Sequence, residues 1–173
     1  MTESYTPTKK AVKATINLGD IPLDVYQLPD GSYQLYTESI TDAIAQEHKD
    51  LLTFIKGKSE QALPFKGYNL LHAPRVEVEE EEIYIKVAPI RLATSYWLYR
   101  AIKGNKKAQA LVQASIVETI ERRADKAFSI KRSETEYNKL FTETMEQILI
   151  ENREEISERR LPGDDLYYPD EIN

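Results

Sequence analysis

The stretch SITDAIAQEHKDLLTFIKGK, residues Ser39 to Lys58, decides how we expect this chain to fold. Two groups of apolar residues in it recur at the spacing of a buried helical face: Ile40, Ala43 and Ile44, then Leu51, Leu52 and Ile55. Helices this short are marginal alone in water, so each must bury its apolar face against the other. The spacing therefore predicts a helix-turn-helix-like pair.

The second helix of this pair would turn polar and cationic side chains to solvent. Side chains of these types donate hydrogen bonds to phosphates or to base edges. The alternative is an ordinary packed helix pair that binds nothing. The residues that we single out as nucleic-acid-binding candidates are His48, Lys49, Thr53, Lys56 and Lys58.

The run EHKDLLTFI, with SITDAIAQ before it, resembles the segment that opens phage regulatory proteins of the Rha and antirepressor type. Their pattern has a Ser-led helix, a Gly-Lys-x-His turn and a helix that reads roughly Lys-Asn-Leu-Leu-Arg-Asp-Ile. The positions that match are His48, Lys49, Leu51, Leu52 and Ile55. The positions that depart are Ala45 at the glycine's place, Gln46 at the lysine's and Thr53 at the arginine's.

A second segment, Ile85 to Phe128, resembles the distal half of such regulators and of hypothetical cyanobacterial proteins. The resemblance implies a non-enzymatic regulator of the phage or mobile-element type. Such a protein would bind double-stranded DNA, or would bind a repressor or other protein partner as an antirepressor does. Glycine adopts a positive φ without strain, and Ala45 stands where the family pattern has glycine. The φ of Ala45 therefore tests whether this chain keeps the same turn.

The composition limits the class of protein. The chain has 173 residues, no cysteine and a net charge of −6. This length suits one domain with a buried core, and no apolar run approaches the about 20 residues that span a bilayer. We therefore expect a cytoplasmic protein with no disulfide and no membrane segment.

The charge is distributed unevenly along the chain. Residues 61–132 carry 13 basic and 8 acidic side chains, whereas residues 133–173 carry 4 basic and 12 acidic ones. This asymmetry predicts a basic surface in the middle of the chain and an acidic arm at its end. The arm either covers that basic surface or simply keeps the protein in solution.

The rest of the chain predicts an α+β fold, in which two small β-hairpins pack on the helix pair. Alternating residues and turn signals place the hairpins at Ile21–Leu28 with Tyr33–Tyr36, and at Arg75–Val78 with Ile83–Val87. A helical hairpin follows, formed by Pro89 to Ile102 and Lys106 to Phe128. The segment from Met1 to Ala14 is expected to be frayed.

The second helix of the helical hairpin carries one continuous stripe of the kind that packs on a core. The stripe consists of Ala108, Leu111, Val112, Ser115, Ile116, Thr119 and Ile120. Its corner at Gly104 gathers lysines that would contact a nucleic-acid backbone, and these further candidates are Lys103, Lys106 and Lys107.

Residues Glu134 to Arg160 predict one long helix with a narrow apolar stripe and a largely acidic opposite face. Such a stripe suits a coiled-coil or partner-helix seam, where Asn152 would set the register. Packing within the same molecule is the alternative. The candidate partner-binding residues are Tyr137, Phe141, Met145, Ile148, Asn152 and Ile156.

These patterns divide the chain into three parts. We expect a regulator-like domain at 15–128, an acidic helix at 133–160 that makes a homo-oligomer through 134–160, and a disordered acidic tail at 161–173.

No catalytic or metal-binding constellation is evident. His48 and His72 lack the spacing of metal ligands, and the run Glu79 to Glu82 reads as a solvated hairpin tip. We therefore expect no catalytic residue, cofactor or metal, and a DNA-binding regulator as the function. A protein-interaction module that binds no DNA is the alternative. A metal-dependent nuclease, through Glu82 and Lys86, is the second alternative.

Overall fold

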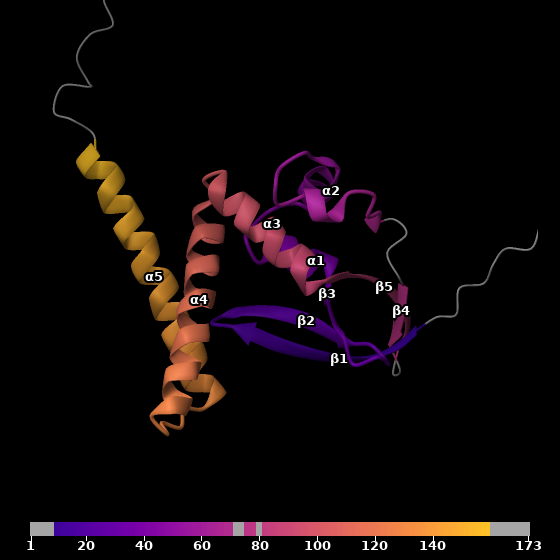
Figure 1. Ribbon diagram of the computed structural model, residues 1–173, viewed down its shortest axis with the longest axis horizontal. Coiled ribbons are helices and arrows are strands. Elements are labelled where there is room, and N and C mark those ends of the chain that lie inside the picture. The colour runs from indigo at the N-terminus through magenta and orange to yellow at the C-terminus, as the bar shows by residue number, and fades with distance from the viewer. Residues whose placement is uncertain (1–8, 71–74, 79–80, 160–173) are drawn as a thin grey trace, which may run out of the picture.

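The computed structural model describes residues 9–70, 75–78 and 81–159, and its elements make an α+β fold (Figure 1). The strands are β1 (Lys9–Leu18), β2 (Ile21–Gln27), β3 (Tyr33–Tyr36), β4 (Arg75–Val78) and β5 (Glu81–Pro89). The helices are α1 (Thr37–Asp42), α2 (His48–Lys56), α3 (Ile90–Ile102), α4 (Lys106–Ala127) and α5 (Glu134–Arg159), with a short 3-10 turn, η1 (Leu63–Phe65). The α+β class is confirmed. The predicted tail, 161–173, lies outside the described residues.

The strands form one closed barrel in the order β1-β2-β3-β5-β4, in which β4 lies beside β1. β1 and β4 are parallel, and the other neighbouring pairs are antiparallel. Both predicted hairpins are present, as β2 with β3 and β4 with β5. They are not separate units, because β3 also pairs with β5, where Leu35 lies opposite Ala88.

β1 begins at Lys9, so the expectation of a frayed segment is wrong from Lys9 to Ala14, and residues 1–8 lie outside the described part of the chain. The strand pairs with β2 in one continuous antiparallel register that ends with Leu18 opposite Ile21. Apolar residues from Val12 to Leu18 do alternate with polar ones, but Val12 and Ile16 are largely exposed, so the alternation does not mark a buried face. The partner strand, rather than local alternation, therefore explains its order.

The sheet separates two apolar clusters. On the face turned to the helices, side chains such as Leu23, Leu35 and Ala88 join the main core. On the opposite face, which is the interior of the barrel, a smaller cluster is formed by Ala11, Tyr26, Leu28 and Val87, with Tyr36 and Ile85 packed on it. Burial on both faces fixes the register of β2, since a shift of one residue would exchange the two sets.

The predicted helix pair, α1 and α2, packs on α3 and is held there by buried polar contacts. Trp97 Nε1 donates to the carbonyl oxygen of Ile40 at 2.7 Å, and the Tyr96 hydroxyl donates to Asp50 Oδ2 at 2.7 Å. Arg100 Nε also lies 3.3 Å from the same carboxylate oxygen as an ion pair. The predicted apolar faces are buried at Ile40, Ala43, Ile44, Leu51 and Ile55, and half-buried at Leu52.

α5 packs along α4 and against the turn between β1 and β2 (Figure 1). The side chains of Tyr137, Phe141 and Met145 are buried, the latter two in the main core. The structure therefore corrects their assignment as partner-binding residues, and the alternative of packing within the same molecule applies to all three. Ile148 is half-buried, and the side chain of Ile156 lies outside the described part of the chain.

Asn152, predicted to set the register of a helix seam, lies on the same side of α5. Its Nδ2 is buried, and no described residue accepts a hydrogen bond from it. The partner-seam prediction thus remains for the end of α5 alone, from Ile148 onward.

The stripe predicted on α4 is divided between core and solvent. Ala108 and Leu111 are buried against α3, as expected, but Ile116 and Ile120 are exposed. The reason is that α5 packs on a different face of α4, where the Tyr137 hydroxyl donates to the buried Asp125 carboxylate at 2.9 Å. The lower half of the predicted stripe therefore faces water.

Candidate nucleic-acid interface

The turn between α1 and α2 adopts the left-handed conformation that glycine favours. Ala45 has a φ of 54°, and the backbone N–H of Ala45 donates to the Asp42 carbonyl at 3.0 Å. The next residue, Gln46, donates its N–H to the Thr41 carbonyl at 3.0 Å, which closes the turn. An alanine in this region costs about 1–2 kcal/mol relative to the right-handed one, so the turn keeps its geometry under strain.

The first turn of α2 is not a free cationic surface. Lys49 Nζ lies 2.6 Å from Glu47 Oε2, and this hydrogen bond, more than the charge of the carboxylate alone, raises the pKa of Lys49. His48 is half-buried, and its Nε2 has no hydrogen-bond partner among the described residues. Asp50 adds a further negative charge, which Arg100 offsets. The predicted contacts at His48 and Lys49 are therefore weakened by their surroundings.

The middle and end of α2 point outward. Thr53 is exposed, and its hydroxyl donates to the Lys49 carbonyl at 3.1 Å, which leaves its oxygen free to accept. Lys56 is exposed one turn further along the same face. Residues three apart on a helix are neighbours, so these two side chains form one polar surface.

Beyond α2 the chain turns back at η1 and closes a hollow of about 610 Å³. Three exposed lysines lie at its rim: Lys56, Lys58 and Lys66. Leu63, which is exposed, and Tyr68, which is half-buried, supply apolar surface to the same hollow. We call these five residues the lysine hollow.

The three lysines carry uncompensated charge. In the described part of the chain none of them forms an ion pair, although the exposed Glu60 is close in sequence. Lys56 stands in the last turn of α2, where a cation also opposes the helix dipole. Burial raises the pKa of Tyr68, so its hydroxyl stays neutral beside the lysines.

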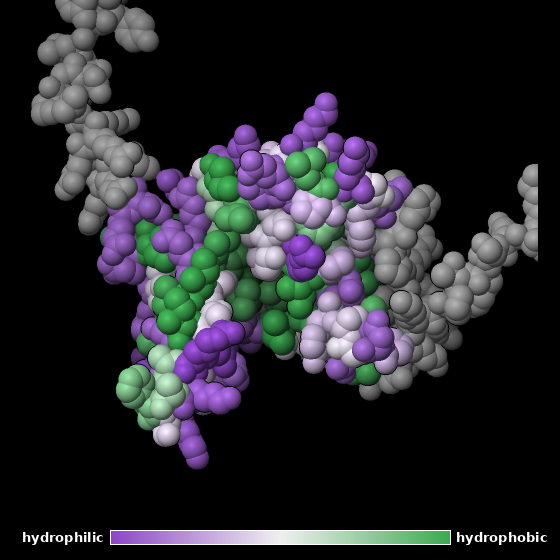
Figure 2. Space-filling view, viewed as in Figure 1, coloured by the Kyte–Doolittle hydropathy of each residue, from purple (hydrophilic) through white to green (hydrophobic). Residues whose placement is uncertain are grey.

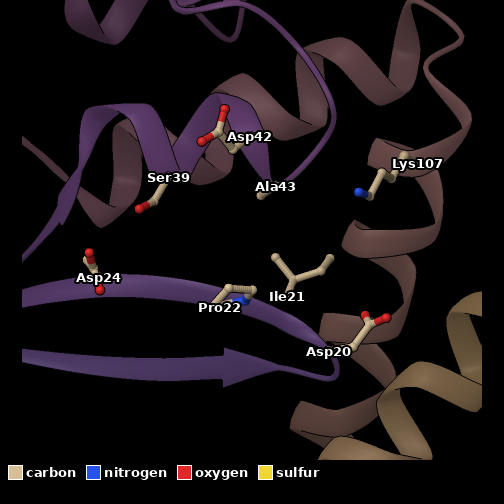
Figure 3. Close-up of a pocket in the computed structure, with 8 residues that line it drawn as sticks. All are labelled: Asp20, Ile21, Pro22, Asp24, Ser39, Asp42, Ala43 and Lys107. Carbon is tan, nitrogen blue, oxygen red and sulfur yellow. The ribbon is translucent and has the colours of Figure 1, made fainter.

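The lysines at the Gly104 corner do not join this surface as one cluster. Lys103 Nζ lies 5.8 Å from the centroid of the Tyr99 ring. Lys106 Nζ lies 3.4 Å from Gln109 Oε1 on its own helix. Lys107 points into a separate hollow, which lies between α1 and the β1–β2 hairpin (Figure 3). The predicted corner is therefore divided.

The hollow that receives Lys107 has a volume of about 400 Å³ and is acidic. Asp20, Asp24 and Asp42 line it from three different elements, and their carboxylates lie apart (Figure 3). Asp24 is already engaged, since it accepts from the Thr15 hydroxyl at 2.8 Å. Three carboxylates around Lys107 make this face unsuited to phosphate.

Two arginines at the joint between α4 and α5 are structural. Arg122 makes two hydrogen bonds of 2.8 Å to the Glu134 carboxylate, and its guanidinium lies 3.9 Å from the centroid of the Tyr137 ring. Arg132 Nε lies 3.5 Å from the buried carboxylate of Asp125. These cations hold two helices together and are not available to a ligand.

Sequence reasoning found two members of the lysine hollow, Lys56 and Lys58, and missed Lys66 and Tyr68. Those two residues are close to α2 only because η1 reverses the chain. The Leu63-Pro64-Phe65 run indicates a loop, but a loop alone does not tell where its far end returns. The one sequence feature that could have grouped the three lysines is their short separation along the chain.

Comparisons with known proteins leave the resemblance to phage regulators as an expectation. Neither the protein-family models, nor the curated proteins, nor the solved structures give a match to this chain. Within residues 9–70, 75–78 and 81–159, no three or more His, Asp or Glu side chains gather as they would around a metal ion. Every helix in the same part of the chain is too short or too polar to cross a membrane.

Proposed function

We propose that this protein is a non-enzymatic regulator of the phage or mobile-element type that binds double-stranded DNA through the lysine hollow and the adjoining face of α2. The observation that carries the proposal is the set of three exposed lysines around one hollow, Lys56, Lys58 and Lys66, none of which forms an ion pair with a residue that the structure describes. The resemblance of Ser39 to Lys58 to the opening segment of phage regulators supports the same surface.

In the proposed complex the lysines act as point charges on successive phosphates, and they supply affinity more than sequence preference. Thr53 lies one turn before Lys56 and accepts a hydrogen bond from a donor on a base edge, because its own proton is donated to the Lys49 carbonyl. Lys49 contributes less, because Glu47 competes for its ammonium group. Lys103 and Lys106 lie outside this contact.

The net charge of −6 does not oppose this arrangement, because much of the negative charge is remote from α2. The acidic helix α5 packs on α4, and α3 and α4 lie between α5 and α2 (Figure 1). Screening at physiological salt acts over about 8 Å, so carboxylates on α5 have little effect at the lysine hollow.

A protein-interaction module that binds no DNA is the second candidate function. The observation that favours it is the exposed apolar surface of α4, which includes Ile116 and Ile120. Contiguous apolar surface on a folded protein marks an interaction site more often than an accident of composition. The two functions are compatible in one molecule, because α2 and the exposed face of α4 are separate surfaces.

The test is a fluorescence-anisotropy titration of a short labelled duplex at low salt. One variant combines Lys56→Gln, Lys58→Gln and Lys66→Gln. Its matched control combines Lys103→Gln, Lys106→Gln and Lys107→Gln, which removes the same charge. We expect the first variant to lose at least about tenfold in affinity and the control to lose less than about threefold. Equal losses in both, or no binding by the unaltered protein, would leave only the interaction module.

A further inference from the structure

The exposed apolar residues of α4 form one ridge rather than a scatter. Ile116, Ile120 and Phe128 are 56%, 63% and 78% exposed. Together with Val112 and Ala124 they repeat at intervals of four from Val112 to Phe128, the residue that caps the C-terminal end of α4. Residues spaced by four are the i±4 ridge through which two helices pack most commonly in globular proteins. Figure 2 shows hydrophobic side chains that run along α4 on the face turned to the viewer.

One end of this ridge adjoins a hollow between α3 and α4. The hollow has a volume of about 320 Å³, with the small residues Ser95 and Ser115 beside an apolar lining. That lining is formed by Trp97, Leu98, Val112 and Ile116. The other end of the ridge carries Phe128, a protruding aromatic side chain next to the turn at Ser129. The ridge thus has a hole at one end and a knob at the other.

The knob and the hole are placed symmetrically about Ile120. Val112 lies eight residues before it and Phe128 eight residues after it, about 12 Å in each direction along the helix. In a twofold interface residue i of one copy meets residue j of the other and j meets i, so this equal spacing lets Phe128 of each copy meet Val112 of the other.

We propose that two copies of this chain associate through α4, with a twofold axis beside Ile120. The axes of the two α4 helices cross at about −50°, the angle that aligns the i±4 ridges of both helices. Ile120 of each copy packs against its equivalent, Ile116 lies near Ala124 of the other copy, and each Phe128 enters the other copy's hollow at Val112.

The area of the ridge suits a second copy. The exposed apolar surface of Leu98, Ile116, Ile120 and Phe128 is on the order of 500 Å², near the upper end for a monomer. This is more than half of the about 800 Å² that a standard interface buries per partner, and the polar residues around the ridge would supply the rest.

The charges beside the ridge also permit a second copy. Across an axis at Ile120, Gln113 falls near Ala127 and Val117 near Arg123, so no like charges meet at these positions. The acidic side chains of α5 are on another face of α4. This dimer is independent of nucleic-acid binding, and it differs from an oligomer built through 134–160.

The first test is sedimentation equilibrium of the full chain, with Ile120→Glu and the matched control Ile150→Glu. Ile150 is 50% exposed on α5, so the control adds the same charge at an equally exposed isoleucine away from the ridge. We expect a dimer for the unaltered chain and for Ile150→Glu, and at least about a tenfold rise in the dissociation constant for Ile120→Glu. A monomeric unaltered chain, or equal dissociation of both variants, would overturn the proposal.

A second test, by disulfide cross-linking, does not depend on whether Ile120→Glu folds. The chain has no cysteine, so one introduced thiol reports on one position. Under an added mild oxidant we expect Ile120→Cys to form a covalent dimer, because the twofold axis brings the two sulfur atoms into bonding range. Ile150→Cys should remain monomeric on a denaturing gel. Cross-linking of Ile150→Cys as fast as Ile120→Cys, or of neither, would contradict the dimer.

Discussion

The hydroxyl of Tyr96 donates a hydrogen bond of 2.7 Å to Asp50 Oδ2, which joins α3 to the first turn of α2 across 46 residues of sequence. Tyr96 is fully buried, and burial, followed by this hydrogen bond, raises the pKa of Tyr96 far above its usual range. The hydroxyl therefore remains a donor at every physiological pH. The orientation of α2, and with it the lysine hollow, depends on this contact.

Replacement of Tyr96 by phenylalanine should lower the free energy of unfolding by about 1.5–3 kcal/mol, because a hydrogen bond to a charged acceptor is lost. Urea denaturation followed by circular dichroism measures the change. Tyr33→Phe is the control, since that tyrosine is exposed and should cost less than about 0.5 kcal/mol. If both variants lose the same amount, the Asp50 contact does not hold α2.

Ala45→Gly should stabilise the protein by about 0.5–1 kcal/mol. Relief of the positive φ outweighs the added freedom of glycine in the unfolded chain. The opposite sign is expected for Ala124→Gly, at an exposed position in the last turn of α4, which should cost up to about 1 kcal/mol. Thermal denaturation of both variants is the measurement. A loss of stability in Ala45→Gly would mean that the turn does not have this geometry.

Gly19→Ala should be far more costly than Gly31→Ala, although both glycines have positive φ, 66° and 83°. A Cβ at Gly19 would lie 2.8 Å from Phe141 Cδ1 on α5, whereas nothing lies within 4 Å of one at Gly31. The backbone strain is common to both, so the difference, about 1–3 kcal/mol, reports the overpacking against α5. Equal costs would show that α5 does not pack on the β1–β2 turn.

Acid should weaken the joint between α4 and α5. The hydrogen bonds from Arg122 lower the pKa of Glu134 below its ordinary value of 4.5. A carboxyl group whose pKa is lower in the folded state than in the unfolded state stabilises the fold fully above its ordinary pKa. This stabilisation is lost as the pH falls through the folded-state pKa. Because Glu134 is 76% exposed, solvent screening limits the effect to about 0.5 kcal/mol.

The measurement is urea denaturation of Glu134→Gln at pH 7 and at pH 3. The variant should be less stable than the unaltered protein at pH 7, and the difference should be smaller at pH 3, because protonation of Glu134 removes its charge as the pH falls through its lowered pKa. Glu146→Gln, on the exposed face of α5, should show no such difference at either pH. A constant difference for Glu134→Gln at both pH values would exclude the ion pair as its cause.

Much of the fold was predictable because local chemistry and tertiary structure agree. The Pro29-Asp30-Gly31-Ser32 turn and the alternation before it specify the β2–β3 hairpin without help from the rest of the chain. The faces of α1 and α2 are likewise local, since Ile40 and Leu51 repeat with their neighbours at a helical spacing. These elements depend on contacts close in sequence.

The elements that sequence reasoning missed depend on distant partners. β1 is ordered by β2 on one side and by β4 on the other, and the apolar residues that alternate along it, such as Val12 and Ile16, are largely exposed. The narrow stripe of α5 reads the same whether Phe141 meets α4 of its own chain or another chain. The lysine hollow needs the reversal at η1, which brings Lys66 back to Lys56. In each case the missing information is which segments meet.

The most direct test of the central claim is the salt dependence of DNA binding, measured by anisotropy between low and physiological salt. Each phosphate neutralised adds about −0.9 to the slope of log K against log salt concentration. Removal of the charges at Lys56, Lys58 and Lys66 should therefore flatten the slope by about 2.7. A slope that is unchanged in this triple variant, with DNA still bound, would contradict the lysine hollow as the site of binding.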